Sequence, residues 1–366
     1  MSSLLVAAGG GGDALGALVV HRLLDEPGPP AAVMTFAWER LRVDPIPGPR
    51  SIADFRGLTN IGHHNALITE QTRPVPPSGS TLPRLAAEID VPLLLLDPSH
   101  GAVGLRQQVA EAVQLLEVDA VHIVDIGGDI LAVGDEPDLR SPLADTLALC
   151  ACLDLTVPVD VLVAGAGLDG ELHADYIRQR VDELKGRTIG RVTEDHTHRA
   201  STLLEWHPSE ATALLTAAAQ GLLGTVELRD RGTPLTIDED SPLVYCLDLI
   251  AVRDTNRLAA TLCKSTSLDA AENIVLGLCG SSEIDYERSK QDQIDRSPSP
   301  SSPIDPRRIR AFLLEANERG VDYVTVRRVA EAVDARSVDV ETMRTVLRQH
   351  DARGDSPPLW RTLASA

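Results

Sequence analysis

The segment SSLLVAAGGGGDALGALVVHRL, residues 2–23, carries the clearest fold signal in this 366-residue chain. An apolar run at residues 4–8 predicts a strand, four glycines follow it, and an amphipathic helix is expected to begin at Asp13. A strand that passes through glycines into a helix is how a doubly wound α/β sheet begins. The segment therefore predicts an α/β fold with a candidate ligand-binding loop after its first strand.

The glycine loop fits the pattern G-x-G-x-x-A from Gly9 to Ala14. Glycine lets the backbone approach a ligand closely, and the first-turn amides of the following helix have no partner within the helix. A carboxylate at the start of that helix repels a bare phosphate unless a metal or a hydroxyl lies between them. The alternative is a tight turn that binds nothing. The residues assigned here to cofactor or ligand binding are Gly9, Gly10, Gly11, Gly12 and Asp13.

The chain continues as an alternation of apolar strands and helical patterns. Apolar runs at residues 31–38, 91–97, 120–125 and 159–164 predict strands that are parallel to the first strand. The predicted fold class is therefore α/β, a doubly wound, mainly parallel sheet of the Rossmann-like kind.

Three regions are expected from the distribution of these patterns. Residues 1–290 should form the α/β ligand-binding or catalytic domain, interrupted at residues 41–90 by a loop-rich insertion. A stretch rich in Ser and Pro at residues 291–306 predicts a linker. Three helical patterns in residues 307–366 predict a separate, small, helical C-terminal unit.

Three strand ends carry loops that combine glycine with carboxylates: GGGGD at residues 9–13, DIGGD at residues 125–129 and GAGLDGEL at residues 165–172. Parallel strands direct their carboxyl ends to one edge of the sheet, so these loops are expected to share one crevice. The residues assigned to catalysis are Asp125, Asp129 and Glu171, and those assigned to ligand binding are Gly127, Gly128, Gly165, Gly167 and Asp169.

The sequence leaves open what these carboxylates bind. They could accept hydrogen bonds from sugar hydroxyls, or hold Mg²⁺, which prefers oxygen ligands and bridges to phosphate. Asp125 and Asp129 are the candidate metal ligands, Mg²⁺ is the candidate ion, and any other cofactor is unknown. The alternative is that each Asp caps a helix and each Gly makes a turn, without a shared ligand.

Two further candidates lie outside these loops. Glu39 stands at the end of the second strand, where an acid binds ribose hydroxyls in dinucleotide folds. The alternative for Glu39 is a surface ion pair with Arg40 or Arg42. His63 belongs to a polar cluster in the insertion and is a candidate acid or base, because histidine titrates near neutral pH. The alternative for His63 is a surface position.

Composition limits the partners. The net charge of −20, from 34 basic and 54 acidic residues, argues against nucleic acid and anionic membranes as partners. No apolar run reaches the ~18 residues that span a bilayer, and the N-terminus lacks a basic leader, so a cytoplasmic location is expected. Five cysteines without a C-x-x-C pair predict reduced, buried thiols.

The order GGGGDALGA, WER, DPIPGPR, VDIGGDIL with SPLAD, and GAGLDGEL resembles the domain-of-unknown-function family 1152. The resemblance covers most of residues 1–290 and implies a Rossmann-like α/β domain, without implying an activity. The matching positions are Gly9–Asp13, Trp38–Arg40, Asp125–Asp129 and Asp169–Glu171.

The function expected from these features is an enzyme that binds a nucleoside-like, nucleotide-like or polyhydroxylated small molecule and catalyses group transfer or hydrolysis. No G-x-S-x-G elbow and no G-x-x-x-x-G-K-[ST] loop is present. The alternative is a ligand-binding regulatory protein with a helical output tail, and a lesser alternative is an NAD(P)-dependent oxidoreductase. A homo-oligomer is compatible with either.

Overall fold

A computed structural model describes residues 2–10, 12–229, 232–296, 304–335, 338–351 and 354–363. Five parallel strands form the centre of its main sheet, in the spatial order β7-β2-β1-β8-β9. Their bounds are β1 (Ser3–Ala7), β2 (Ala32–Phe36), β7 (Leu93–Leu96), β8 (Ala120–Ile126) and β9 (Val159–Ala164). This is the Rossmann strand order, so the predicted α/β, mainly parallel sheet is confirmed.

Antiparallel strands extend this sheet at both edges to nine strands among the described residues. Beyond β9 lie β13 (Leu243–Asp248) and β10 (Arg187–Arg191), and beyond β7 lie β5 (Ala66–Ile68) and β4 (Thr59–Asn60). Strands β4 and β5 belong to the insertion at residues 41–90. That insertion also contains η1 (Ile52–Asp54), β3 (Phe55–Arg56), β6 (Arg73–Pro74) and α2 (Leu82–Glu88).

Helices cover both faces of the sheet because successive side chains of a strand point to opposite faces. Leu4 and Val6 of β1 pack into one core, and Leu5 and Ala7 pack into the other. The first core includes side chains of α3 (Gly101–Leu115), α4 (Pro142–Ala151), α5 (Ala174–Glu183), α8 (Leu249–Thr255), α9 (Ala259–Leu262) and α10 (Leu268–Cys279). The second includes side chains of α1 (Asp13–His21), α2, α6 (Glu194–Leu203) and α7 (Glu210–Ala219). The short helices η2 (Pro98–His100) and η3 (Asp129–Leu131) follow β7 and β8, respectively. No helix in the described ranges is long and apolar enough to cross a membrane.

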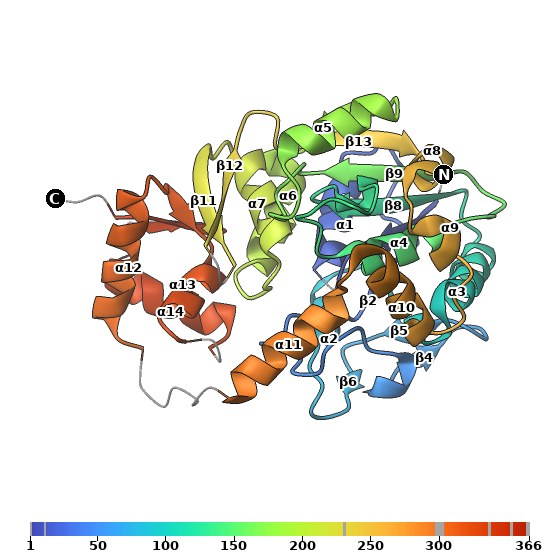
Figure 1. Cartoon of the computed structure of the whole chain (residues 1–366), viewed down its shortest axis with the longest axis horizontal. Coiled ribbons are helices and arrows are strands. Elements are labelled where there is room, and N and C mark those ends of the chain that lie inside the picture. Colours follow the sequence, from blue (N-terminus) through green and yellow to red (C-terminus); the bar gives the residue numbers. More distant parts are fainter. Residues whose placement is uncertain are drawn as a thin grey trace.

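The C-terminal unit contains strands as well as the three predicted helices, α12 (Pro306–Glu318), α13 (Val326–Ala332) and α14 (Val340–Asp351). Its strands are β14 (Tyr323–Val324), β15 (Asp355–Ser356) and β16 (Leu359–Arg361), which are too short to give a sequence pattern. β14 pairs in parallel with β11 (Gly224–Leu228), which forms a hairpin with β12 (Thr233–Ile237). The C-terminal unit and this hairpin therefore share one sheet (Figure 1).

The segment before this unit was predicted to be a linker over residues 291–306. Helix α11 (Glu283–Arg296) occupies the first part of it, and residues 297–303 lie outside the described part of the chain. Two ion pairs also join the C-terminal unit to β11. Arg319 and Arg328 of the unit both pair with Glu227 of β11. The unit is thus held against the hairpin by strand pairing and by charge.

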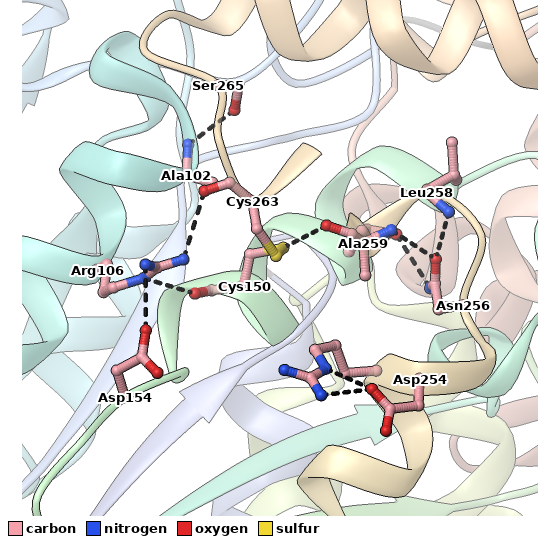
Figure 2. Close-up of a disulfide and its surroundings, with 12 residues drawn as sticks. Ala102, Arg106, Cys150, Asp154, Asp254, Asn256, Leu258, Ala259, Cys263 and Ser265 are labelled. Carbon is pink, nitrogen blue, oxygen red and sulfur yellow. Dashed lines mark hydrogen bonds and ion pairs between the residues drawn. A yellow bond between two sulfur atoms is a disulfide. The ribbon is translucent and has the colours of Figure 1, made fainter. Parts of the chain in front are cut away.

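The expectation of reduced thiols is wrong for two of the five cysteines. Cys150 of α4 and Cys263 after α9 form a disulfide (Figure 2). The two residues are 113 positions apart, and both belong to the core on the α3–α4 side of the sheet. The pairing could not be read from spacing because packing of α4 against α9, which the sequence does not reveal, brings the sulfurs together. Cys152, Cys246 and Cys279 are free thiols.

Reduction of this disulfide is expected to destabilise the protein. A crosslink that closes a loop of this length restricts the unfolded chain, and removing a native disulfide lowers the unfolding free energy by about 2–4 kcal/mol. Urea unfolding of the Cys150→Ser/Cys263→Ser variant should show this loss, and Cys279→Ser should behave like the wild type. A reductant that leaves the wild-type midpoint unchanged would mean that the two thiols are not bonded in solution.

Candidate functional site

A cavity of about 140 Å³ lies at the carboxyl ends of β1, β8 and β9. The strand order reverses beside β1, so this is the switch point at which open α/β sheets bind ligands. The acidic residues that line it are Asp13, Glu39, Asp125, Asp129, Asp145, Asp169, Glu171, Glu210, Glu283 and Glu287. The basic residues that line it are Arg40, His207, Arg229 and Arg327.

Two groups of carboxylates at this cavity have the geometry of a cation site. Carboxylate oxygens of Asp125, Asp129 and Asp145 lie within 4.8 Å of one another, and so do oxygens of Asp129, Asp169 and Glu171. Asp129 belongs to both groups. Oxygen-rich sets of this kind suit Mg²⁺, Mn²⁺ or Ca²⁺.

Glycines allow the loops after β8 and β9 to approach each other. Gly127 and Gly128 have φ values of 136° and 102°, which are left-handed conformations that side chains disfavour. A Cβ atom at Gly127 would lie 2.5 Å from Cγ of Asp169. These two glycines therefore bring Asp129 next to Asp169.

Asp129 and Asp145 stand out because neither carboxylate has a hydrogen-bond or ion-pair partner among the described residues. Asp129 is 8% exposed and Asp145 is 3% exposed, and Oδ1 of Asp145 is fully buried. Asp125, in contrast, accepts a hydrogen bond from the Ile130 amide at 3.1 Å. Buried polar groups in folded proteins are nearly always paired, so these two unpaired neighbouring carboxylates are the candidates for holding a cation.

The electrostatics of the cluster lead to the same conclusion. Burial, and then the neighbouring carboxylates, raise the pKa values of Asp125, Asp129 and Asp145 well above their usual range. Burial likewise raises the pKa of Asp13 and of Asp169 to about 7, against the opposing effects of Arg40 and Arg229 respectively. Raised pKa values favour the protonated carboxyl groups, whereas a bound cation would favour the carboxylates.

Four other acidic residues hold the walls of the cavity through hydrogen bonds to protein. Glu171 accepts from the amides of Arg140 and Ser141, both at 2.9 Å. Glu283 accepts from the first-turn amides of α4, and burial raises its pKa to about 8. The remaining two are Glu39, which accepts from the Thr81 amide and hydroxyl, both at 2.6 Å, and Glu287, which accepts from Trp38 Nε1 and the Gly48 amide.

The structure brings most of the predicted site residues to this cavity. Those that line it are Gly9, Gly10, Gly12, Asp13, Glu39, Asp125, Asp129, Asp169 and Glu171. Gly127, Gly128, Gly165 and Gly167 turn the loops without lining it, and Gly11 lies outside the described residues. His63 is not brought to the cavity: it is exposed, and its amide donates to Glu111 of α3 at 2.7 Å.

The cavity also includes residues to which the sequence-based prediction assigned no role. Asp145 lies in the first turn of α4, Arg229 follows β11, and Arg327 belongs to α13. His207 is buried, and burial lowers its pKa to about 4, so its imidazole is neutral. Its Nδ1 accepts from the Ser209 amide at 3.3 Å, which places the proton on Nε2. Of these residues, only Asp145 could have been found from the sequence, because it belongs to the SPLAD segment next to the predicted crevice.

Two glycines of the loop after β1 pack closely against protein atoms. A Cβ atom at Gly10 would lie 2.5 Å from the Trp38 carbonyl oxygen, and one at Gly9 would collide with the Asp13 carboxylate. These glycines therefore accommodate protein atoms. Glu39, the candidate ribose ligand, is already hydrogen-bonded to Thr81.

Comparison with known proteins identifies a family. The model of the family described as "Protein of unknown function (DUF1152)" matches residues 4–291. No curated protein and no solved structure matches this chain. The match spans the Rossmann-like sheet except Ser3, the first residue of β1, and every cavity residue except Arg327. The chain therefore belongs to the DUF1152 family.

Proposed function

We propose that this protein is a divalent-cation-dependent enzyme that acts on a nucleotide-like or polyhydroxylated small molecule by group transfer or hydrolysis. The observation that carries the proposal is the pair of buried, unpartnered carboxylates, Asp129 and Asp145, beside Asp125 at the strand switch point. The cytoplasmic location expected from the sequence is part of this proposal.

The cation would be held by Asp125, Asp129 and Asp145. When bound, it supplies a Lewis acid that polarises the reacting group and lowers the pKa of a bound water. The chain's own contribution is to keep these carboxylates together: Gly127 and Gly128 set the loop, and the Ile130 amide orients Asp125. The second group, Asp129 with Asp169 and Glu171, lies where it can meet a second cation or the ligand's hydroxyls.

Asp169 is the candidate general acid or base. A group that transfers protons works best when its pKa lies near the working pH, and burial raises the pKa of Asp169 to about 7. The Glu171 amide donates to its Oδ1 at 3.1 Å and fixes the side chain in the cavity wall. This hydrogen bond positions Asp169 for proton transfer beside Asp129.

A regulatory ligand-binding protein is the second candidate. One observation favours it: Arg327, from the C-terminal unit, lines the cavity, so a ligand there touches the tail directly. A regulatory protein would bind its ligand without consuming it, whereas an enzyme would release product.

Turnover in a panel of nucleosides, nucleotides and sugar phosphates separates these functions. The purified full-length protein is incubated with each compound, with Mg²⁺ or Mn²⁺ and with EDTA, and products are followed by mass spectrometry. We expect consumption of at least one compound with cation and none with EDTA. Turnover that persists in EDTA would refute the cation dependence, and binding without any turnover would favour the regulatory function.

A further inference from the structure

We propose that Arg40, Arg229 and Arg327 form an anion subsite that binds a phosphate group of the ligand, with the C-terminal unit supplying one of the three arginines. The inference deepens the proposed function, because it names the ligand as a phosphorylated small molecule and rests on that ligand occupying the same cavity. The three arginines come from the end of β2, the end of β11 and helix α13.

Arg40 has no hydrogen-bond or ion-pair partner for its guanidinium among the described residues. It lines the cavity and its side chain is accessible to solvent. Desolvation by the surrounding protein is the largest cause that lowers the pKa of Arg40. The positive charges of Arg229 and Arg327 lower this pKa further. Among the described residues, no carboxylate pairs with the Arg40 guanidinium at this cavity.

The other two arginines are fixed by their partners. Arg229 donates to the Asp169 carbonyl oxygen and lies 3.5 Å from Glu171. Arg327 pairs with Glu210 at 3.1 Å and with Glu331 at 2.9 Å. These contacts hold both groups at the cavity wall and balance their charges, so the unbalanced positive charge is that of Arg40.

Phosphate is the anion that best suits this arrangement. A guanidinium group presents a planar set of donors that matches phosphate, and three such groups can bind several of its oxygens. Carboxylates line the cavity beside them and would hold the cation. A phosphorylated ligand can therefore reach both the cation and the arginines, which a neutral sugar cannot do.

The subsite also gives the C-terminal unit a role. Arg327 lies at the start of α13, and Thr325 caps that helix by accepting from the Arg328 amide at 3.1 Å. Thr325 also donates to Glu210, the partner of Arg327. Docking of this unit on β11 therefore sets the position of the third arginine, and the tail is part of the binding site.

Binding of inorganic pyrophosphate, measured by calorimetry in EDTA, tests the subsite without the cation. We expect the wild type to bind, Arg40→Ala to bind about 10-fold more weakly or worse, and Arg40→Lys to recover part of the affinity. Arg22→Ala, at the far end of α1 from the cavity, should bind as the wild type does. Absence of wild-type binding, or equal affinity of Arg40→Ala and the wild type, would overturn the proposal.

A pair of arginine variants within the C-terminal unit tests the tail. Arg327→Ala should also weaken pyrophosphate binding by about 10-fold, while Arg308→Ala, whose arginine pairs with Asp334 of the same unit and does not line the cavity, should not. Thermal unfolding of both variants checks that the unit remains folded. Equal losses in the two variants would overturn the role of Arg327. Mn²⁺ binding without pyrophosphate tests the carboxylates separately, so failure of one site is distinguishable from failure of the other.

Discussion

Replacing Asp129 with Asn is expected to abolish turnover and to weaken Mn²⁺ binding by about 100-fold or more. Loss of a residue that only supports a metal ligand already costs about 10–100-fold in affinity, and Asp129 belongs to both carboxylate groups. In the metal-free protein, burial and four neighbouring acids oppose ionisation of Asp129, and Asn at this position carries no charge at any pH. The melting temperature in EDTA should therefore stay the same or rise.

Calorimetric Mn²⁺ titration and thermal unfolding in EDTA measure the two effects. Asp138→Asn, an exposed acid with no cavity contact, is the control and should change neither quantity. A large loss of stability together with unchanged Mn²⁺ affinity would show that Asp129 has a structural role, and the cation site would be wrongly assigned.

The stability of the metal-free protein should fall as pH rises toward 8. Burial raises the folded-state pKa of Asp13 and Asp169 from 3.8 to about 7 and that of Glu283 from 4.5 to about 8. Over this window the folded protein binds more protons than the unfolded chain, so each group lowers the unfolding free energy by up to about 1.4 kcal/mol per pH unit. The loss of stability is complete at pH values above the folded-state pKa values. It is absent at pH values below the unfolded-state pKa values.

Urea unfolding in EDTA across this pH range, for the wild type and for Asp13→Asn/Asp169→Asn, isolates the contribution of two of these groups. Acids whose pKa is lowered, such as Glu210 beside Arg327, act in the opposite direction but are common to both proteins. The wild type should lose several kcal/mol more than the variant between about pH 5 and pH 8. Saturating Mn²⁺ should remove most of that difference. If the unfolding free energies of the wild type and the variant change in parallel with pH in the absence of Mn²⁺, the shifted pKa values are contradicted.

The parallel strands of the central sheet were predictable because they are short, mostly apolar and largely buried on both faces, as in the LLLL of β7. The convergence of Asp125, Asp129 and Asp169 followed from the same prediction, since parallel strands end at one edge. Local sequence therefore determined both the sheet and the residues at its strand ends.

The rest of the site depends on contacts that no local pattern encodes. Arg327 reaches the cavity because β14 pairs with β11, about 100 residues earlier in the chain. Glu39 lies at the predicted strand end, but its partner Thr81 comes from the insertion, which the sequence shows only as loop. The sequence analysis assigned no role to Asp145, because its lack of a hydrogen-bond partner is visible only in the folded protein.

Anomalous scattering from Mn²⁺ in crystals of the full-length protein tests the cation site most directly. We expect a peak at the carboxyl end of β8, about 2 Å from carboxylate oxygens of Asp125, Asp129 and Asp145. A peak at a different place, or none at this position under saturating Mn²⁺, would contradict the claim that these carboxylates form a cation site.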